Sequence, residues 1–547
     1  KKGLQPKPLD IHDCIGARIE STAAKHAQHT AIVFEGSTIT WSEFNKLTNR
    51  YARIFKDRGL IRGDAACVMM ENRIEFLAVI VGLNKIGVTA GLLNTNLTGR
   101  SLQHCIKVIS AKHCIFGAEV MPAITEVHAS LDLVPGSDFL FVPDTKPDSC
   151  PAFADDLTLV ADSADDTNPA DTGDNILGQT AFYIYTSGTT GLPKAAVMSN
   201  RRYLASADLS GKAGLKTTAS DRIYLCLPLY HATGLLMGVG SSFTTGASMF
   251  IRRRFSASNF FSEIRDYQCS HMVYIGELCR YLTNIPQQPG ERLLPLHTIM
   301  GNGMRPDIWM NFKTRYGIKR ICEIYGASEG NVAFANLLNK DCTVGMTTSE
   351  VLLVKYDVDQ DEILRDASGK CIPVSRGEAG LLLSKITPES KFEGYTDENA
   401  TEGKIIRDAI KDGDSWFNTG DLMRVIDVGY ALGYDHYQFV DRVGDTYRWK
   451  SENVSTNEVG EIINGFPQIK FCNVYGVVVP HAEGKAGMVS ITLNDGESEL
   501  DLVAFADFVR QQLPPYAVPV FIRIDEDIDV TGTFKMLKGD LRKQAYD

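Results

Sequence analysis

The chain has 547 residues, enough for several domains of about 100 to 200 residues each. Hydrophobic residues make up 44% and charged residues 22%, a composition typical of a globular protein. The formal net charge of -11 argues against a nucleic-acid-binding protein, because such proteins carry basic patches.

Cysteine usage and hydropathy indicate the compartment. The twelve cysteines include no C-x-x-C pair, so we predict neither a zinc site nor a disulfide framework, and a cytoplasmic, reducing location fits best. The most hydrophobic stretch, residues 76–93, contains Asn84 and Lys85 and falls short of the roughly 20 apolar residues of a spanning helix. We therefore expect no transmembrane segment or signal peptide, while peripheral membrane association stays open. The basic triplet at 252–254 is interpreted as a solvated loop end.

In the N-terminal region, helical and strand-like spacings of apolar residues alternate. Apolar spacing predicts helices at 11–26, 41–55 and 73–86, and strands at 30–34, 38–40, 64–70 and 88–93. This alternation implies a mostly parallel sheet covered on both faces. Residues 143–174 are rich in Asp, Ala, Thr and Pro without a clear period, which predicts a mobile connection.

The stretch from Phe182 to Lys194 (FYIYTSGTTGLPK) combines a buried strand with a small-residue loop. Such a loop presents backbone N–H groups and hydroxyls with little bulk, which suits a polyphosphate. The Walker pattern does not fit, because Pro193 precedes the lysine and Ala195 follows it. The alternative is a flexible surface turn.

Further along, several polar or glycine-containing motifs follow predicted strands. Tyr230 and His231 follow the strand at 222–226 and can wall a pocket, although a lone histidine is more often structural. The strand at 296–305 contains Gly301, Asn302 and Gly303, which leave room for a flat ring at a strand end. A G-x-G pattern alone is weak evidence.

The strand at 320–325 leads into Tyr325, Gly326, Ala327, Ser328, Glu329 and Gly330. Tyr325 can stack on an adenine, Ser328 can donate to phosphate, and Glu329 offers the hard oxygen that Mg²⁺ prefers. The alternative is a turn with a solvated glutamate. Asp421 leaves a strand after Thr-Gly and is suited to accept ribose hydroxyls.

The pattern in the last part of the chain predicts a small β-rich subdomain and a short region of alternating helices and strands. Short strands across 351–386 predict a β-rich subdomain, and residues beyond 456 alternate again, with helices at 456–463 and 500–512 and strands at 474–479, 488–493 and 521–524. Lys535 lies in a Gly/Thr loop, where surface charge is the usual role of a lysine.

The motif YTSGTTGLPK (185–194), together with the Tyr325 to Glu329 motif, resembles the signatures of the adenylate-forming superfamily of acyl-CoA synthetases, luciferases and adenylation domains. The resemblance implies an α/β fold in two domains: a large multi-subdomain N-terminal domain (1–440) with layered sheets and a β-rich subdomain, and a small α+β C-terminal domain (441–547). A hinge joins them near Arg442 to Asp445, with Gly444 as the pivot, where many relatives carry Asp or Lys.

The resemblance also implies roles for individual residues. It assigns catalysis to Lys535, Glu329, Lys194 and His231, with Glu329 also binding Mg²⁺ and His231 lining the acyl pocket. It assigns ATP or CoA binding to Thr186, Ser187, Gly188, Thr189, Thr190, Gly191, Gly301, Asn302, Gly303, Tyr325, Gly326, Ala327, Ser328, Asp421, Arg442 and Ser451.

Residues 441–459 (DRVGDTYRWKSENVSTNEV) resemble the signature of the fatty-acid-transport-protein and very-long-chain acyl-CoA synthetase group. That group usually has glycine where Ser451 stands, near the path of CoA, so we expect impaired or unaltered thioester formation. The resemblance implies an ATP- and Mg²⁺-dependent fatty acyl-CoA synthetase. Alternatives are a CoA ligase for a carnitine-like, bile or aromatic acid, an acyl-AMP ligase that loads a carrier protein, and a non-enzymatic lipid-uptake protein.

Overall fold

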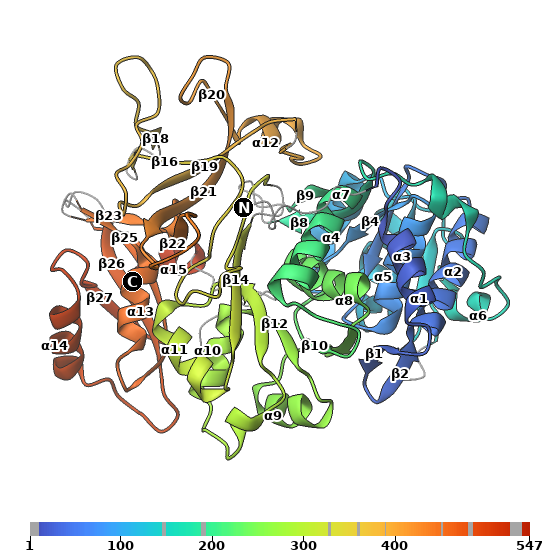
Figure 1. Ribbon diagram of the computed structural model, residues 1–547, viewed down its shortest axis with the longest axis horizontal. Coiled ribbons are helices and arrows are strands. Elements are labelled where there is room, and N and C mark those ends of the chain that lie inside the picture. The colour runs from blue at the N-terminus through green and yellow to red at the C-terminus, as the bar shows by residue number, and fades with distance from the viewer. Residues whose placement is uncertain are drawn as a thin grey trace.

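The computed structural model describes residues 10–144, 149–186, 193–326, 330–357, 362–388, 390–449, 452–479, 485–525 and 539–546. Figure 1 shows two large layered sheets, a β-rich part above them and a smaller C-terminal part beside them. This arrangement is the α/β class that the alternation of predicted helices and strands favoured.

An eight-stranded sheet combines two strands near the N-terminus with six strands from residues 222–335, in the order β15-β14-β13-β12-β10-β11-β1-β2. Its inner strands pair in parallel, and the edge strands β2 and β15 pair antiparallel. The parallel strands therefore point their carboxyl ends to one edge, where ligands collect in α/β proteins. The strands are β1 (Thr30–Phe34), β2 (Ser37–Thr40), β10 (Arg222–Leu225), β11 (Ser248–Ile251), β12 (His271–Ile275), β13 (Thr298–Asn302), β14 (Arg320–Gly326) and β15 (Ala333–Ala335).

A seven-stranded sheet lies beside it, in the order β7-β6-β5-β3-β4-β8-β9. Its last pair, β8 and β9, is antiparallel and brackets the predicted phosphate loop. The strands are β3 (Ala65–Met69), β4 (Thr89–Leu92), β5 (His113–Gly117), β6 (Phe139–Val142), β7 (Asp155–Asp156), β8 (Thr180–Thr186) and β9 (Lys194–Ser199).

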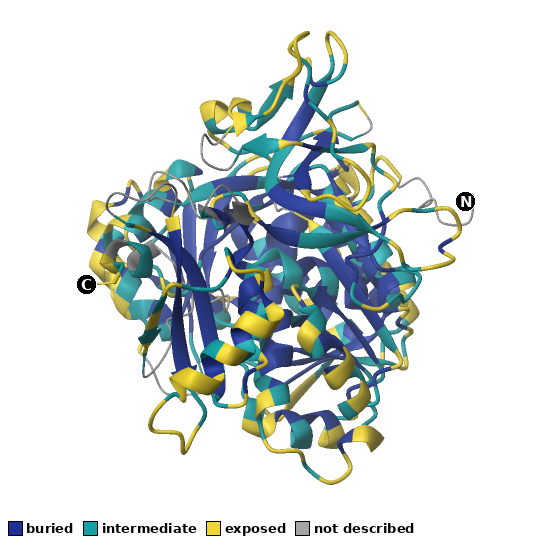
Figure 2. Cartoon of the chain, turned by 90° about the vertical axis from the view of Figure 1, so that its left-hand side faces the viewer, coloured by how far each residue is buried: buried dark blue, intermediate teal, exposed yellow. Residues whose placement is uncertain are grey.

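Helices cover these sheets, and the strands between them are buried (Figure 2). The helices are α1 (Ile15–Lys25), α2 (Trp41–Asp57), α3 (Ile74–Lys85), α4 (Gly99–Val108), α5 (Met121–Val127), α6 (Leu157–Ala161), α7 (Asn200–Asp208), α8 (Gly240–Thr245), α9 (Ala257–Asp266), α10 (Gly276–Asn284) and α11 (Pro306–Arg315). Two π-helical segments, η5 (Leu209–Gly214) and η6 (Thr233–Val239), extend this layer.

Helix α3 accounts for the most hydrophobic stretch of the sequence. Ten of its residues in succession, 76–85, are buried, because the helix packs against α1, α2 and the strands β3 and β4. A helix that is apolar all round belongs to a protein core or a membrane. Across the described ranges, no helix is both long and apolar enough to span a bilayer.

The β-rich part and the C-terminal domain complete the chain. The first contains the strands β16 (Val351–Val354), β19 (Gly380–Lys385), β20 (Ile405–Arg407), β21 (Ser415–Ile426) and β22 (His436–Arg442), the ribbon β17 (Tyr356–Asp357) with β18 (Glu362–Ile363), and the helix α12 (Glu398–Glu402). The C-terminal domain contains β23 (Tyr447–Trp449), β24 (Glu452–Val454), β25 (Ile469–Val478), β26 (Lys485–Leu493), β27 (Phe521–Ile524), α13 (Thr456–Asn464), α14 (Leu502–Gln512) and α15 (Gly539–Gln544).

The region expected to be a mobile connection is instead tied to helix α2. Residues 149–174 include β7, α6 and a short 3₁₀ turn, and their acidic side chains meet basic ones on α2. Arg53 pairs with Asp165 at 3.2 Å, and Lys56 with Asp171 at 2.9 Å. The prediction of mobility from composition was wrong because aspartates of this region pair with a basic face of α2 instead of being fully solvated.

The basic triplet at 252–254 is likewise not a free loop end. Arg253 contacts the carboxylates of Glu35 at 2.6 Å and Asp144 at 2.7 Å, and lies 3.7 Å from Glu71. Its guanidinium also lies 5.0 Å from the centre of the Phe34 ring. These partners follow strands of both large sheets, so Arg253 joins the two sheets. The interpretation as a solvated end was wrong for this residue.

We predict that Arg253→Gln lowers stability by about 2 to 3 kcal/mol, because charged hydrogen bonds contribute more than neutral ones and three carboxylates lose their cation. Thermal unfolding followed by circular dichroism measures this. The control is Arg254→Gln, because Arg254 is 81% exposed and its pair with Glu71 should contribute less than about 1 kcal/mol. Equal effects of the two substitutions would contradict the role of Arg253.

Candidate active site

A cleft of about 2850 Å³ opens where the strand ends of the eight-stranded sheet meet the pair β8–β9 and the hairpin β21–β22. The cleft is lined by most of the predicted site residues that the structure describes. They are Lys194, His231, Asn302, Gly303, Tyr325, Gly326, Asp421 and Arg442. Residues separated by more than two hundred positions therefore converge on one cavity.

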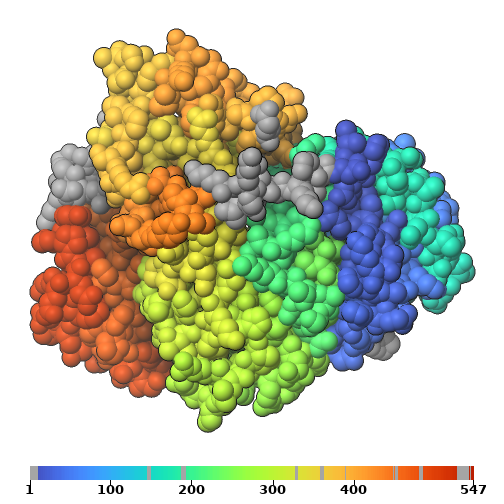
Figure 3. Space-filling view, in the orientation of Figure 1, coloured from blue at the N-terminus to red at the C-terminus, as the bar shows by residue number. Residues whose placement is uncertain are grey.

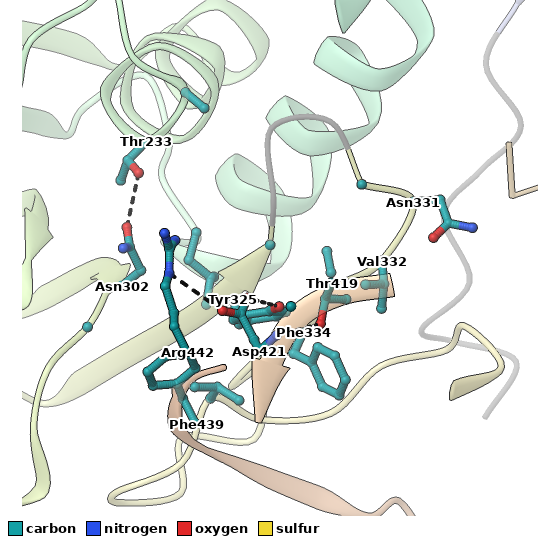
Figure 4. A pocket seen from close by; sticks show the side chains of 18 of the residues that line it. Thr233, Asn302, Tyr325, Asn331, Val332, Phe334, Thr419, Asp421, Phe439 and Arg442 are labelled. Carbon is teal, nitrogen blue, oxygen red and sulfur yellow. Dashed lines mark hydrogen bonds and ion pairs between the residues drawn. The ribbon is translucent and has the colours of Figure 1, made fainter. Parts of the chain in front are cut away.

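Asp421 lines this cleft and lies between Tyr325 and Arg442 (Figure 4). It lies on β21 opposite Arg442 on β22, and it is 7% exposed. Tyr325 Oη donates to Asp421 Oδ2 at 2.5 Å, and Arg442 Nε lies 3.5 Å from Asp421 Oδ1. Burial, followed by the neighbouring Asp421, raises the pKa of Tyr325 well above its usual value, so the phenol stays a donor.

The Tyr325 ring is held in a fixed orientation by two other rings. Phe439 of β22 stacks near it at a centroid distance of 6.3 Å, and Phe334 of β15 meets it edge-on at 5.7 Å. Aromatic pairs at these separations attract each other. Tyr325 also lines the cleft, which is compatible with the stacking role expected from the sequence.

The predicted phosphate loop closes between paired strands. Thr186 at the end of β8 pairs in register with Lys194 at the start of β9. The Lys194 ammonium lies 5.7 Å from the centre of the Tyr395 ring, so a cation–π contact holds its side chain at the cleft. Of the positions between the two strands, residues 187–192 lie outside the described residues.

Glycine geometry fixes the predicted adenine loop. Gly303 has φ of +82°, and a Cβ on Gly276 would lie 1.7 Å from the Gly303 carbonyl oxygen. A Cβ on Gly301 would lie 2.0 Å from the Tyr274 carbonyl oxygen. The loop after β13 therefore lies directly on the end of β12, and only glycine fits at these positions.

Of the two aromatic residues expected to line the acyl pocket, one lines the cleft and the other packs behind the first. His231 lines the cleft, whereas Tyr230 is 5% exposed and packs behind it, with ring centroids 4.6 Å apart. The π-helical segment η6 continues this wall, and Thr233 Oγ1 donates to Asn302 Oδ1 at 3.0 Å (Figure 4). A direct hydrogen bond thus joins η6 to the loop predicted to bind adenine.

Some predicted site residues lie outside the described residues. They are Ser187, Gly188, Thr189, Thr190, Gly191, Ala327, Ser328, Glu329, Ser451 and Lys535. Their roles remain predictions.

Sequence reasoning missed the segment that supports β9. Ser199 N donates to Glu393 Oε2 at 3.1 Å, Val197 N to the Gly394 carbonyl at 3.3 Å, and Thr396 N to the Ala195 carbonyl at 3.1 Å. Residues 393–396 therefore run beside β9, and Tyr395 reaches Lys194 from there. The stretch FEGYTDENATEG is visible in the sequence, but no local pattern tells that it pairs with a strand two hundred residues earlier.

The C-terminal domain packs against helices α10 and α11 (Figure 3). The Arg280 guanidinium of α10 lies 3.7 Å from the centre of the Phe471 ring and donates to the Lys470 carbonyl at 3.1 Å. Arg280 is also paired with Glu277, which lines the cleft. On α13, burial raises the pKa of Glu461, at the edge of the cleft, to about 7.

This chain is similar to known proteins along its whole length. A family model described as "AMP-binding enzyme" matches residues 19–385, and "AMP-binding enzyme C-terminal domain" matches 458–535. The crystal structure of the anthranilate CoA ligase AuaEII in complex with anthranoyl-AMP has a TM-score of 0.83 at 20% identity, covering 98% of each chain. ATP-bound MatB from Rhodopseudomonas palustris has a TM-score of 0.79 at 20% identity, covering 97% of this chain and 99% of the other.

The fold, the cleft and the family matches define an adenylate-forming enzyme, and the chain belongs to the AMP-binding enzyme family. Its class is that of AMP-forming acyl-CoA synthetases. It is 41% identical to "Medium/long-chain-fatty-acid--CoA ligase FadD6" of Mycobacterium tuberculosis over 100% of this chain and 88% of that protein. It is 37% identical to human "Long-chain fatty acid transport protein 1", over 96% and 82% respectively.

We predict that Asp421→Asn weakens ATP binding by about 10- to 100-fold, because charged hydrogen bonds are worth about 1.5 to 3 kcal/mol. Asparagine keeps the shape and one acceptor for Tyr325, so the fold should persist. Isothermal titration calorimetry with ATP measures the change. Asp435→Asn is the control, because Asp435 pairs with Arg376 and is half exposed. An unaltered affinity in Asp421→Asn would remove this residue from the nucleotide site.

Proposed function

We propose that the protein activates a long- or very-long-chain fatty acid as its acyl-adenylate and then transfers the acyl group to CoA. The observation that carries the proposal is the similarity, over 96% or more of this chain, to proteins named as a fatty-acid CoA ligase and a fatty acid transport protein, at 41% and 37% identity. The convergence of Lys194, Tyr325, Asp421 and Arg442 on one cleft supports it.

The chemistry has two halves. A carboxylate oxygen attacks the α-phosphorus of ATP, forming the acyl-adenylate while the bond to pyrophosphate breaks. The CoA thiolate then attacks the acyl carbon, forming the thioester as AMP leaves with the bonding electron pair. A free carboxylate is a poor acyl donor, and AMP is a good leaving group, so adenylation makes the second half possible.

The chain's part is to position the substrates and stabilise charge. Lys194, with Thr186 and residues 187–191, would bind the phosphates, and Asp421 with Arg442 would hold the ribose. Tyr325 would cover the adenine, and His231 would line the acyl side. Lys535 would meet the charge that develops at the α-phosphate, and rotation about Gly444 would then bring Ser451 to the CoA path.

The proposed reaction also needs a Mg²⁺ ion, for which Glu329 is the candidate ligand. Strand β14 ends at Gly326 on the cleft wall, and Glu329 follows three positions later with the carboxylate oxygen that Mg²⁺ prefers. Glu329 would hold the ion. When bound, the ion would neutralise charge on the phosphate oxygens.

The substrate class is tested by acid-dependent ATP–pyrophosphate exchange across acids from acetate to C24 fatty acids, with carnitine, bile and aromatic acids included. AMP release is then measured with and without CoA. We expect exchange with long chains and CoA-dependent AMP release. Exchange confined to aromatic, bile or carnitine-like acids would overturn the fatty-acid assignment. Exchange without a CoA effect would point to a carrier protein as acceptor.

We predict that Lys535→Ala reduces pyrophosphate exchange at least about 100-fold, as expected when a charge-stabilising group is lost. Transfer from preformed acyl-adenylate to CoA should stay within about threefold, because Lys535 acts only in the first half. Lys470→Ala is the control, since this lysine of the same domain pairs with an exposed aspartate. Unchanged exchange in Lys535→Ala would reject the assignment.

A further inference from the structure

Glu323 is a buried carboxyl that none of the proposed steps uses. It lies on β14 two residues before Tyr325, so both side chains point to the same face of the strand. It is 2% exposed, yet it borders the cleft. Burial raises the pKa of its carboxyl to about 8. Buried carboxyls are costly, so one at a cleft wall calls for an explanation from its contacts.

Its partners come from the two neighbouring strands. Met304 N donates to Glu323 Oε1 at 3.1 Å, and the Gly303 amide also donates to the carboxyl. Tyr274 of β12 donates its hydroxyl to Glu323 Oε2. The side chain is therefore held by a phenol and two backbone amides. Glu323 thus joins the ends of β12, β13 and β14 at one point.

The two amides belong to the loop in which glycine geometry matters. Gly303 is in the left-handed region with φ of +82°, and Gly276 leaves no space for a Cβ below it. Thr233 holds the same loop from the other side through Asn302. A glycine-rich loop has few side chains that could fix its position by packing. The hydrogen bonds to Glu323 and the contact with Thr233 therefore fix the position of this loop.

We propose that Glu323 is a positioning residue for nucleotide binding, which fixes the Gly303–Met304 backbone against β12 so that the loop is ready to receive the adenine. This inference rests on the proposed function, which puts the adenine at this loop. Glu323 acts through the loop and does not touch the nucleotide. Its loss therefore weakens the binding of ATP more than the chemical step, as expected for binding shared by ground and transition states.

The sequence offers a matched control in the same sheet. Tyr224 of β10 donates its hydroxyl to Glu263 Oε2 at 2.8 Å, and Glu263 is 8% exposed. This second buried tyrosine–glutamate pair resembles the first but lies away from the cleft lining. Any effect of losing a buried Tyr–Glu hydrogen bond on stability alone should appear in both pairs.

The test compares Glu323→Met, which removes the acceptor at similar volume, with Glu323→Gln, which keeps an oxygen acceptor for the amides. ATP affinity is measured by calorimetry, and KM and kcat by pyrophosphate exchange. Glu323→Met should raise the Kd and KM for ATP about tenfold with kcat within about threefold, since two amides lose their acceptor. Glu323→Gln should restore both to within about threefold of the native values.

Tyr274→Phe and Tyr224→Phe keep the proposal testable if Glu323→Met fails to fold. Both should lower the Tm similarly, but only Tyr274→Phe should raise the Kd for ATP. An unchanged ATP affinity in Glu323→Met, a Glu323→Gln variant no better than Glu323→Met, or equal ATP affinities in the two tyrosine variants would overturn the proposal. Because calorimetry reads ATP binding directly, failure of the fatty-acid assignment would appear separately, as absent exchange with normal ATP binding.

Discussion

The buried carboxylate of Asp421 is the contact on which the cleft depends. It accepts the Tyr325 hydroxyl from the eight-stranded sheet and pairs with Arg442 at the end of the β-rich part. A carboxylate at 7% exposure needs such partners, because an unpaired buried charge is strongly unfavourable. The same pair of contacts thus stabilises the charge and keeps the sheet, the hairpin β21–β22 and the start of the C-terminal domain in register.

The local pattern of the sequence was enough to predict many of the helices and strands. The strand at 30–34 and the strand at 521–524 were predicted with the bounds that the structure has, and the helix at 41–55 was two residues too short. These segments have strong periodicity, and the helix begins at a capping box between Thr40 and Glu43. Local signals of this kind survive in the folded chain because tertiary packing reinforces them.

What the sequence could not predict were pairings between distant segments. The arginine at 253 looks like surface charge until Glu35, Glu71 and Asp144 are brought to it from three separate strand ends. Likewise, the strand-like support of β9 by residues 393–396 has no local signature. The π-helical form of η5 and η6 was also missed, because the small residues of both segments fit several backbone conformations and only packing selects one.

The sequence pointed to candidate site residues where a suitable residue type stands at a predicted strand end, and it gave no sign of residues that support others. Lys194, Tyr325 and Asp421 were identified from such positions, and the structure places them around one cleft. Glu323 and Tyr395 were missed, since a glutamate within a strand and a tyrosine after a glycine carry no distinctive pattern. Their importance lies in which groups they touch, and that information exists only in three dimensions.

The contact between Arg280 and Phe471 holds the C-terminal domain against helix α10. The guanidinium is 5% exposed and lies flat against a ring that belongs to the other domain, while its second partner, Glu277, borders the cleft. Separating β25 from α10 would uncover an aromatic face and return a buried cation to water. The Arg280–Phe471 contact and the Arg280 hydrogen bond to the Lys470 carbonyl therefore oppose separation of the two domains. The helix that makes these contacts begins at the wall of the cleft.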